Sequence, residues 1–414
     1  MTNTNKFNVI VVGSGAAGMI AAITASKNNE KVLLLEQLPT LGAKLKATGG
    51  GKCNLSNTLE NSEFMNSFGR NGRFMTEALE MFDYKSLIKF LEKIGVTTHI
   101  PDGFRIFPTT HNSTTILTAL EKELEKQNVK VLCSTKVEKI IVEDNIIKGI
   151  SSQDKFFYSP KVIVATGGLG YPILGASGDG HTFASSVGHK VTELYPAMLP
   201  LYAKETWVEN CKADTIAKVQ IKIDLPKAKK LKAIGDLIFT KNGIRGPVVL
   251  DFAREITPFL QKYKEVPLLM NLVNGRNEED IFTHLKKQVL NKPEANMVEH
   301  LYTLLPKSVV LEICKLCNAN PDERFNKLDG ATRNRLVKTL CSTPLTIIGS
   351  AGFDKAMITR GGVSLKEINP KTMQSKLVEG LYFCGEVMDL DGPCGGYNLQ
   401  WSFSSGYLAG HLFI

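Results

Sequence analysis

The chain has 414 residues, of which 43% are hydrophobic and 22% charged, values typical of a globular protein with two or three domains. No apolar run is long enough to cross a bilayer and no targeting segment stands out, so we expect a cytoplasmic protein without a membrane partner. Eight cysteines are too few for a disulfide scaffold in so long a chain, and the lone pair Cys314 and Cys317 lacks the second pair that a zinc site needs, so no metal is expected.

The net charge of +9 fits a nucleic-acid partner, an anionic cofactor or a solvated surface. The densest basic run, "PKAKKLK" at 226–232, has no aromatic residues between its lysines. This pattern favours a surface loop over a nucleic-acid contact.

Residues 7–36 are predicted to form a strand, a turn, a helix and a second strand. The first strand, "FNVIVV", is apolar throughout, as expected for a strand covered on both faces. The turn "GSGAAG" leads into the alanine-rich "AAGMIAAITASKN", and "KVLLLE" forms the next strand. This βαβ unit predicts a parallel sheet.

Further along, helical apolar spacing covers 73–94 and 114–127. The segments "VKVLCS", "VEKIIVEDNIIKGISS" and "KVIVATGG" are predicted strands. From about 196, "MLPLYA", "AKVQIKIDL", "GDLIFT" and "PVVLDFA" predict short antiparallel strands. Helices follow over about 276–340, and strands return with "LTIIGS" and "AMITRGGVSL".

This order of predicted strands and helices indicates an α/β fold with a discontinuous first domain. A Rossmann-type domain would comprise 1–195 and 366–414. A β-rich, barrel-like substrate domain would comprise 196–275 and 341–365, and a small helical cap would comprise 276–340.

The turn after the first strand matches the dinucleotide fingerprint G-x-G-x-x-G. Gly13 would permit the tight turn, Gly15 would let a pyrophosphate approach the backbone, and Gly18 would let helix and strand pack closely. The helix N-terminus favours phosphate. Glu36, 21 positions after Gly15, would hydrogen-bond the adenosine ribose and repel a 2′-phosphate.

Two distant segments favour FAD over NAD as the resident dinucleotide. "VIVATGG" at 162–168 and "YFCGEVMD" at 382–389 are both apolar strands that run into glycine, which suits an extended cofactor. "GGYNLQWSFSSGYLAG" then offers a helix N-terminus for negative charge on the reduced flavin. A second fingerprint is not evident, so NAD(P)H would bind only transiently as an electron donor.

The segment "TGGGKCNLSN" at 48–57 is not a phosphate loop, because its spacing fails and Cys53 stands where that motif needs Ser or Thr. Its three glycines instead let backbone pass close to a flat ring or a pyrophosphate. No partner cysteine stands nearby, so Cys53 is interpreted as a small packing residue rather than a redox thiol. Whether Cys384 and Cys394 have a redox role is open.

The chain resembles the BaiN-like family of FAD-dependent oxidoreductases, which have one Rossmann unit. The resemblance rests on "VIVVGSGAAGMIAA", "LGAKLKATGGGKCNLSN", "GFRIFP", "ATGGLGYPILGASGDGHTFASSVGHKV", "GDLIFTKNGIRGP" and "GLYFCGEVMDLDGPCGGYNLQWSFSSG", which span the chain. It implies an FAD domain with barrel-like and helical insertions. Family members include reductases of steroid-type enones and aminoacetone-oxidase-like enzymes, so the resemblance leaves the substrate open. The chain departs from the family pattern at Lys52, Lys241 and Arg245.

Together these observations predict an FAD-dependent oxidoreductase in which hydride passes through flavin N5. The predicted reaction is reduction of an enone-type double bond in a small molecule, with NAD(P)H as donor. An amine or aminoketone oxidase that uses oxygen is the alternative enzyme. A flavin-containing RNA-associated protein is the alternative from another class, suggested only by the charge. The oligomeric state is open.

Arg105 and Tyr397 are the candidate catalytic residues, with a surface contact and core packing as their respective alternatives. The predicted cofactor contacts are Gly13, Ser14, Gly15, Ala16, Ala17, Glu36, Gln37, Lys44, Gly49, Gly50, Gly51, Cys53, Asn54, Val137, Ala165, Thr166, Gly167, Gly385, Glu386, Asp389, Gly396, Tyr397, Asn398 and Leu399.

Overall fold

The computed structural model describes residues 5–28, 30–153 and 155–412. The chain divides into a first unit, Met1–Tyr195 with Met357–Ile414, and a second unit, Pro196–Ala356. It leaves the first unit within β11 (Tyr195–Ala197) and returns just before β18 (Ile358–Arg360). Each unit has its own hydrophobic core.

The first unit is built on a five-stranded parallel sheet with the strand order β19-β10-β1-β2-β6. Four of its strands are buried along their whole length, as expected for a sheet covered on both faces. The carboxyl ends of parallel strands share one edge, where ligands of such sheets bind. The strands are β1 (Val9–Val12), β2 (Val32–Leu35), β6 (Lys130–Leu132), β10 (Val162–Val164) and β19 (Leu381–Phe383).

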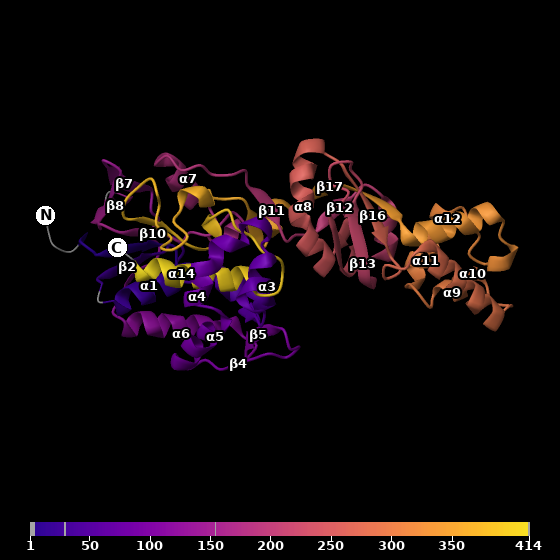
Figure 1. Ribbon diagram of the computed structural model, residues 1–414, viewed down its shortest axis with the longest axis horizontal. Coiled ribbons are helices and arrows are strands. Elements are labelled where there is room, and N and C mark those ends of the chain that lie inside the picture. The colour runs from indigo at the N-terminus through magenta and orange to yellow at the C-terminus, as the bar shows by residue number, and fades with distance from the viewer. Residues whose placement is uncertain (1–4, 29, 154, 413–414) are drawn as a thin grey trace. The chain divides into compact units, whose positions relative to one another are not determined.

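The first and last long helices of the chain pack against each other beside this sheet (Figure 1). They are α1 (Ala16–Lys27) and α14 (Tyr397–His411). A Cβ atom on Gly406 or Gly410 would lie only 2.3 or 2.6 Å from a backbone oxygen of α1. These two glycines therefore allow the helices to approach more closely than larger residues would permit.

The helical spacing at 73–94 corresponds to two helices rather than one, α4 (Thr76–Met81) and α5 (Tyr84–Lys93). The helical conformation is interrupted before Asp83, whose carboxylate accepts the N–H of Ser86 and caps the start of α5. The remaining elements of the unit are α2 (Ala43–Ala47), α3 (Asn61–Asn66), α6 (Ser113–Lys126), α7 (Asp179–Ser186), β3 (Ser56–Asn57), β4 (Thr98–His99), β5 (Arg105–Pro108), β7 (Lys139–Glu143), β8 (Ile146–Ser152) and β9 (Lys155–Tyr158).

The second unit contains a closed antiparallel barrel with the strand order β12-β15-β14-β13-β16-β17. Its strands are β12 (Leu201–Ala203), β13 (Thr215–Ile223), β14 (Lys232–Thr240), β15 (Gly243–Arg245), β16 (Val266–Asn271) and β17 (Thr343–Ser350). The predicted fold class, a Rossmann-type domain with a barrel and helices inserted into it, is confirmed.

The strand predicted for "PVVLDFA" is wrong, because this segment begins α8 (Pro247–Tyr263). Pro247 occupies the first helical position, where its fixed φ suits a helix and its missing N–H costs nothing. The apolar spacing continues as Val248, Phe252 and Ile256 and buries one helical face. A short apolar run cannot distinguish a buried strand from a helix unless the longer period is considered.

Five helices follow in the second unit: α9 (Glu278–Asn291), α10 (Met297–Leu301), α11 (Lys307–Leu316), α12 (Gly330–Cys341) and, after β17, the short α13 (Gly352–Lys355). Capping boxes fix the starts of α9 and α10 at Asn277 and Asn296. The division of this unit into a barrel domain and a helical cap, with the predicted boundaries, stays a prediction.

Candidate cofactor and active site

The fingerprint turn joins the carboxyl end of β1 to α1, and its three glycines have different roles. Gly13 has a φ of +100°, and a Cβ atom there would lie 2.6 Å from the backbone oxygen of Ala165. A Cβ atom on Gly18 would lie 1.9 Å from the oxygen of Gly13. Around Gly15, by contrast, a Cβ atom would meet no described atom within 4 Å. Packing therefore requires Gly13 and Gly18, whereas Gly15 leaves space in front of the helix.

The start of α1 is suited to an anion. Ala16 and Ala17 occupy its first turn, which carries no acidic side chain, and Gly15 provides no side-chain cap. The N–H groups of this turn and the helix dipole therefore remain available to a phosphate.

Glu36 follows β2 and is joined directly to the fingerprint turn. Its Oε2 accepts the backbone N–H of Ser14 at 3.0 Å and the Ser14 hydroxyl at 2.5 Å, while Oε1 accepts the N–H of Leu38 at 2.9 Å. Sequence spacing predicted the acid but not its bond to Ser14, because the two residues meet only across adjacent strands. This network fixes the carboxylate at the edge of the sheet.

Two other predicted residues lie beside this acid. Gln37 donates through Nε2 to the oxygen of Gly175 at 2.7 Å. The N–H of Thr135 donates to the oxygen of Glu36 at 2.8 Å, which brings the segment that contains the buried Val137 to the same edge.

The three glycines of the 48–57 segment all have left-handed backbones, with φ values of 58°, 64° and 89° for Gly49, Gly50 and Gly51. Around Gly50 and Gly51 a Cβ atom would again meet no described atom within 4 Å. Packing within the described chain therefore leaves one side of this loop open. Such a backbone is what close approach to a flat ring requires.

Cys53 is fully buried and left-handed, with a φ of 59°. Burial raises the pKa of its thiol to about 11, although a hydrogen bond with Thr48 opposes the shift. The thiol is therefore neutral at pH 7. All eight cysteines lie among the described residues, and none of them forms a disulfide there.

Asn54 connects this loop to the C-terminal glycine segment. With its amide oriented to satisfy both atoms, it donates to the oxygen of Ser56 at 3.0 Å and accepts the N–H of Gly396 at 3.1 Å. Asn57 Nδ2 also donates to the oxygen of Gly395 at 3.0 Å. Segments more than 300 positions apart in sequence thus meet beside the start of α14.

A second long-range contact joins Lys44 to Glu386, with Nζ 2.8 Å from Oε2. The other oxygen of Glu386 accepts the N–H of Thr359 at 2.9 Å, and the Thr359 hydroxyl accepts the N–H of Leu169 at 2.7 Å. Thr359 was not among the predicted residues, because no motif marks it.

The glycine segment after β10 contributes further predicted residues to this edge. Ala165 donates its N–H to the oxygen of Val12 at 2.9 Å. Gly167 has a left-handed φ of 73° and, like Gly15, no described atom near its Cβ position. Thr166 has a buried hydroxyl without a hydrogen-bond partner in the described part of the chain.

Residues from β19 onward contribute the remaining predicted positions. Gly385 donates its N–H to the hydroxyl of Ser405 on α14 at 2.9 Å. Asn398 holds the loop before α14 through both amide atoms, accepting the N–H of Gly392 at 2.8 Å and donating to its oxygen at 2.9 Å. Leu399 packs at the margin of the first unit's core.

Burial raises the pKa of the Asp389 carboxyl, against the opposing effects of Thr192, Arg360 and Arg70.

Of the two candidate catalytic residues, Tyr397 is buried in an aromatic cluster. Its ring centroid lies 5.0 Å from Phe64, 6.1 Å from Phe68 and 6.5 Å from Phe104. Arg105 starts β5 rather than lying in a loop, and its side chain is half exposed. Hydrogen bonds from the backbone and guanidinium of Arg105 lower the pKa of Asp102 to about 2.

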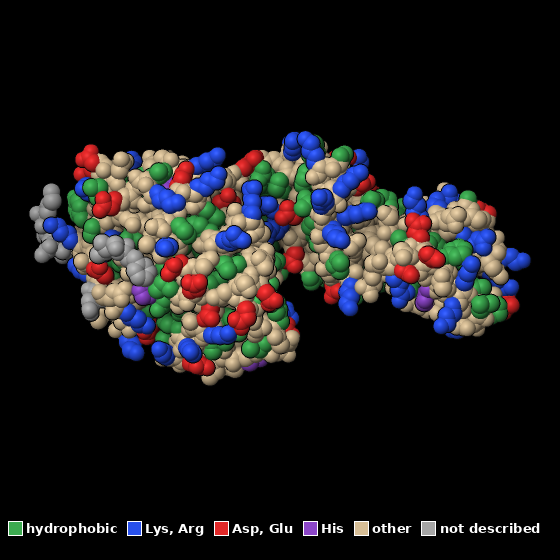
Figure 2. All heavy atoms as spheres, viewed as in Figure 1, with side chains coloured by type: hydrophobic (Ala, Val, Ile, Leu, Met, Phe, Trp, Pro, Cys, Tyr) green, Lys and Arg blue, Asp and Glu red, His purple; other side chains and the backbone are tan. Residues whose placement is uncertain are grey.

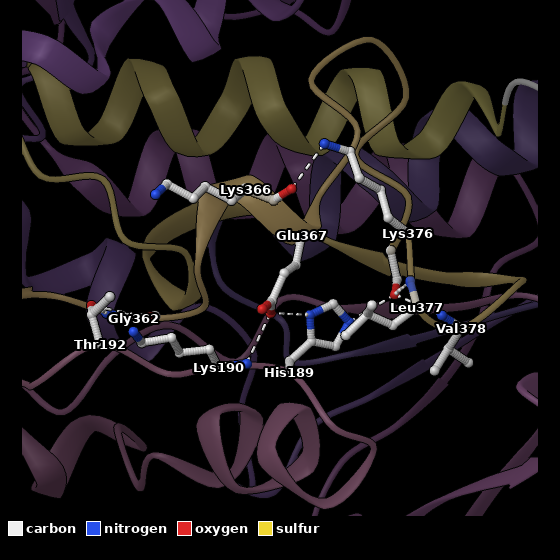
Figure 3. Close-up of polar contacts among 10 residues, drawn as sticks. His189, Lys190, Thr192, Gly362, Lys366, Glu367, Lys376, Leu377 and Val378 are labelled. Carbon is white, nitrogen blue, oxygen red and sulfur yellow. Dashed lines mark hydrogen bonds and ion pairs between the residues drawn. The ribbon is translucent and has the colours of Figure 1, made fainter.

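Two histidines of the 178–189 segment are held within the fold. His189 Nδ1 lies 3.2 Å from a carboxylate oxygen of Glu367 (Figure 3). On the other side of the ring, Nε2 lies 2.7 Å from the hydroxyl of Ser375. The N–H of Lys190 donates to the same Glu367 oxygen, so this network joins two segments of the first unit. Burial lowers the pKa of both His181 and His189, in each case against the charge of a nearby glutamate.

The family model described as the HI0933-like protein Rossmann domain matches residues 7–412 of this chain. The chain belongs to the HI0933-like family. A 3-dehydro-bile acid delta(4,6)-reductase of Clostridium scindens is 31% identical over 405 residues, covering 97% of each chain. A ribosomal RNA dihydrouridine synthase of Escherichia coli K12 is 29% identical over 403 residues, covering 97% of this chain and 96% of that one.

Among solved structures, a 3-ketosteroid-delta4-(5alpha)-dehydrogenase of Rhodococcus jostii RHA1 is 15% identical with a TM-score of 0.52, covering 98% of this chain and 96% of that one. This likeness shows the shared fold. HI0933-like membership confirms the predicted family resemblance and the class, an FAD-dependent oxidoreductase. No described helix is both long and apolar enough to span a membrane.

Proposed function

We propose that the protein reduces a carbon–carbon double bond conjugated with a carbonyl group, in a small enone-type substrate, with NAD(P)H as electron donor. The observation that carries the proposal is the 31% identity, over 97% of both chains, with a reductase named for the Δ4,6 bonds of a 3-dehydro bile acid. In such a compound the ketone at C3 is conjugated with the double bond. The net reaction adds a hydride at the carbon β to the carbonyl and a proton at the α carbon.

The open glycines support FAD as the resident cofactor. When bound, FAD would supply the hydride from N5. The start of α1 at Gly15 would bind the pyrophosphate, and Glu36 would bind the adenosine ribose. Gly50, Gly51 and Gly167 leave space for the cofactor without displacing described protein atoms.

The start of α14 would stabilise negative charge on the reduced flavin. This helix has fifteen residues and no acidic side chain in its first turn, so its dipole is uncompensated there. Tyr397 and Arg105 remain the candidates for positioning the substrate carbonyl.

An RNA substrate is the second candidate, and a specific observation favours it. The second unit carries 25 lysines and arginines against 18 acidic residues, whereas the larger first unit carries 25 against 23. Most of the net charge therefore lies in the inserted unit. In uracil the C5=C6 double bond is conjugated with the C4 carbonyl, so the same reduction would convert uridine to dihydrouridine, the product named for the Escherichia coli relative.

Anaerobic stopped-flow spectroscopy tests both candidates. The purified holoprotein should be yellow, NADH or NADPH should bleach the flavin, and a 3-keto-4-ene steroid should then restore its colour. Restoration by a uridine-containing ribosomal RNA fragment, and not by the steroid, would favour the RNA substrate. Bleaching by amines but not by nicotinamides would instead identify an oxidase, and protein that takes up no FAD would refute the proposal.

A further inference from the structure

The excess charge of the second unit is concentrated on one hairpin of its barrel, β13–β14. Residues 212–232 contain seven lysines and only two acidic residues, Asp214 and Asp224. We define the lysine stripe as Lys218, Lys222, Lys227, Lys229, Lys230 and Lys232, all of which are exposed. On the face of this unit visible in Figure 2, basic side chains are spread over the barrel with few acidic ones between them.

The centre of the stripe brings two like charges together. Lys222 and Lys232 are directly opposite in the antiparallel register of β13 and β14, with both side chains exposed. Like charges at opposed positions destabilise a strand pair. None of the stripe lysines has an ion-pair partner among the described residues. The two like charges therefore face each other without an ion pair to a described acidic residue.

Strand β13 is also distorted where it carries the lysine stripe. The register of β13 shifts between Ile216 and Val219, and Lys218, within this bulge, has a left-handed φ of 53°. Its N–H is held by the Asp236 carboxylate at 3.1 Å. Bulges of this kind re-aim side chains and are common beside functional sites.

The bulge opens onto a hollow of about 260 Å³ in the second unit. Lys218 and Arg276 supply two cations to its wall, and Asn274 and Thr303 supply neutral polar groups. Ile216 and Leu272 are among its apolar lining residues. The hollow thus continues the basic surface and offers both charged and apolar contacts.

We propose that the lysine stripe and the adjoining hollow bind the phosphate backbone of RNA, which would position a uridine-containing substrate. A chain of phosphates relieves the repulsion between Lys222 and Lys232 because it places negative charge along the row. Phosphate contacts need no aromatic side chains, so the lack of interleaved aromatics argues against base stacking here and not against backbone binding. The choice of RNA rests on the RNA form of the proposed function.

The experiment measures binding of the full-length holoprotein to a fluorescein-labelled RNA stem-loop with uridines in its loop, by anisotropy over a range of salt concentrations. The test variant is Lys222→Gln/Lys232→Gln. The matched control is Lys89→Gln/Lys93→Gln, which removes the same charge from two exposed lysines of α5 in the first unit.

The test variant should bind RNA more weakly at every salt concentration, and the slope of log affinity against log salt should fall by about 2, roughly one per lost phosphate contact. Its melting temperature should stay equal or rise, because the like-charge contact is gone, which separates lost binding from misfolding. The control should retain both the affinity and the slope of the original protein.

Equal affinity and slope in the test variant and the control would overturn the inference. Duplex DNA that competes as well as the RNA would overturn RNA as the partner. Flavin re-oxidation by the steroid and by the RNA is measured on the same samples. If RNA binds through the stripe but is not reduced, RNA is refuted as the substrate and the stripe is retained as a binding surface. If RNA is reduced but the stripe variant binds it normally, only the proposed binding surface is refuted.

Discussion

Lys44 and Glu386 lie 342 positions apart in the chain, yet their charged atoms are 2.8 Å apart at the edge of the parallel sheet. Their side chains are 27% and 18% exposed, so water only partly screens the pair. Glu386 in turn accepts the N–H of Thr359, and its ion pair with Lys44 joins the N-terminal part of the first unit to the C-terminal segment.

Replacing Lys44 with Gln should lower the free energy of unfolding by about 1–3 kcal/mol, because the half-buried carboxylate of Glu386 loses its charged partner. FAD affinity should fall as well, since the same edge is the predicted cofactor site. Thermal melting with and without FAD measures both effects. Lys46→Gln, an exposed neighbour on α2, is the control and should change neither.

The fingerprint glycines should separate folding from cofactor binding. Gly15→Ala should change the stability of the FAD-free protein by no more than about 1 kcal/mol, because its φ of −66° is ordinary and its Cβ position is empty. It should still weaken FAD binding. Gly13→Ala should destabilise the FAD-free protein as well, because the new Cβ atom would lie 2.6 Å from a backbone oxygen. Equal FAD affinity in Gly15→Ala and the original protein would contradict this assignment.

The thiol of Cys53 should be unreactive in the folded protein and should take no part in the reaction. With a pKa of about 11 and no exposed surface, its thiol should resist iodoacetamide at pH 7 in the folded protein. Cys53→Ala should keep the rate of flavin reduction within about twofold, because a redox role would depend on the thiolate that burial disfavours. Mass spectrometry of the alkylated protein locates the label, and rapid labelling at this position would show that the thiol is exposed and reactive.

Stability should fall on mild acidification. His181 and His189 have pKa values lowered by burial, so the unfolded chain binds protons more readily than the folded one. Their contribution is complete above the ordinary histidine pKa of about 6.5 and is lost as pH falls below it, by up to about 1.4 kcal/mol per pH unit for each histidine that stays neutral. Urea midpoints across this range measure the loss.

His189→Gln tests one of these contributions separately. The variant should be less stable at neutral pH, because contacts with Glu367 and Ser375 are disturbed. It should also show a shallower decline with acid, since one titrating group has been removed. A decline as steep as in the original protein would assign the acid sensitivity to other groups.

The sequence predicted those features of the fold that depend on residues close together in the chain. The βαβ unit, the fingerprint glycines and Glu36 follow from spacing within about 30 residues, and the structure places them together at one edge of the sheet. The contact of Asn54 with Gly396 and the ion pair of Lys44 with Glu386 depend on how distant segments fold onto each other. Residue type alone suggested that these positions matter, but not what they contact.

The error at α8 has a similar origin. The letters "PVVLDFA" favour a strand by propensity, and only Ile256 and the residues beyond establish the helical period. The opposed lysines of the barrel were equally invisible, because a strand register must be known before Lys222 can be placed opposite Lys232.

The contact between α1 and α14 also has a consequence for biosynthesis. Because synthesis runs from the N-terminus, the ribosome makes α1 before the second unit, whereas α14, which packs on α1 through Gly406 and Gly410, is made after it. The second unit is therefore synthesised, and can fold around its own core, while the first unit still lacks α14. We expect a ribosome-bound chain that stops before residue 397 to bind little FAD, so that flavin binding has to await the synthesis of α14.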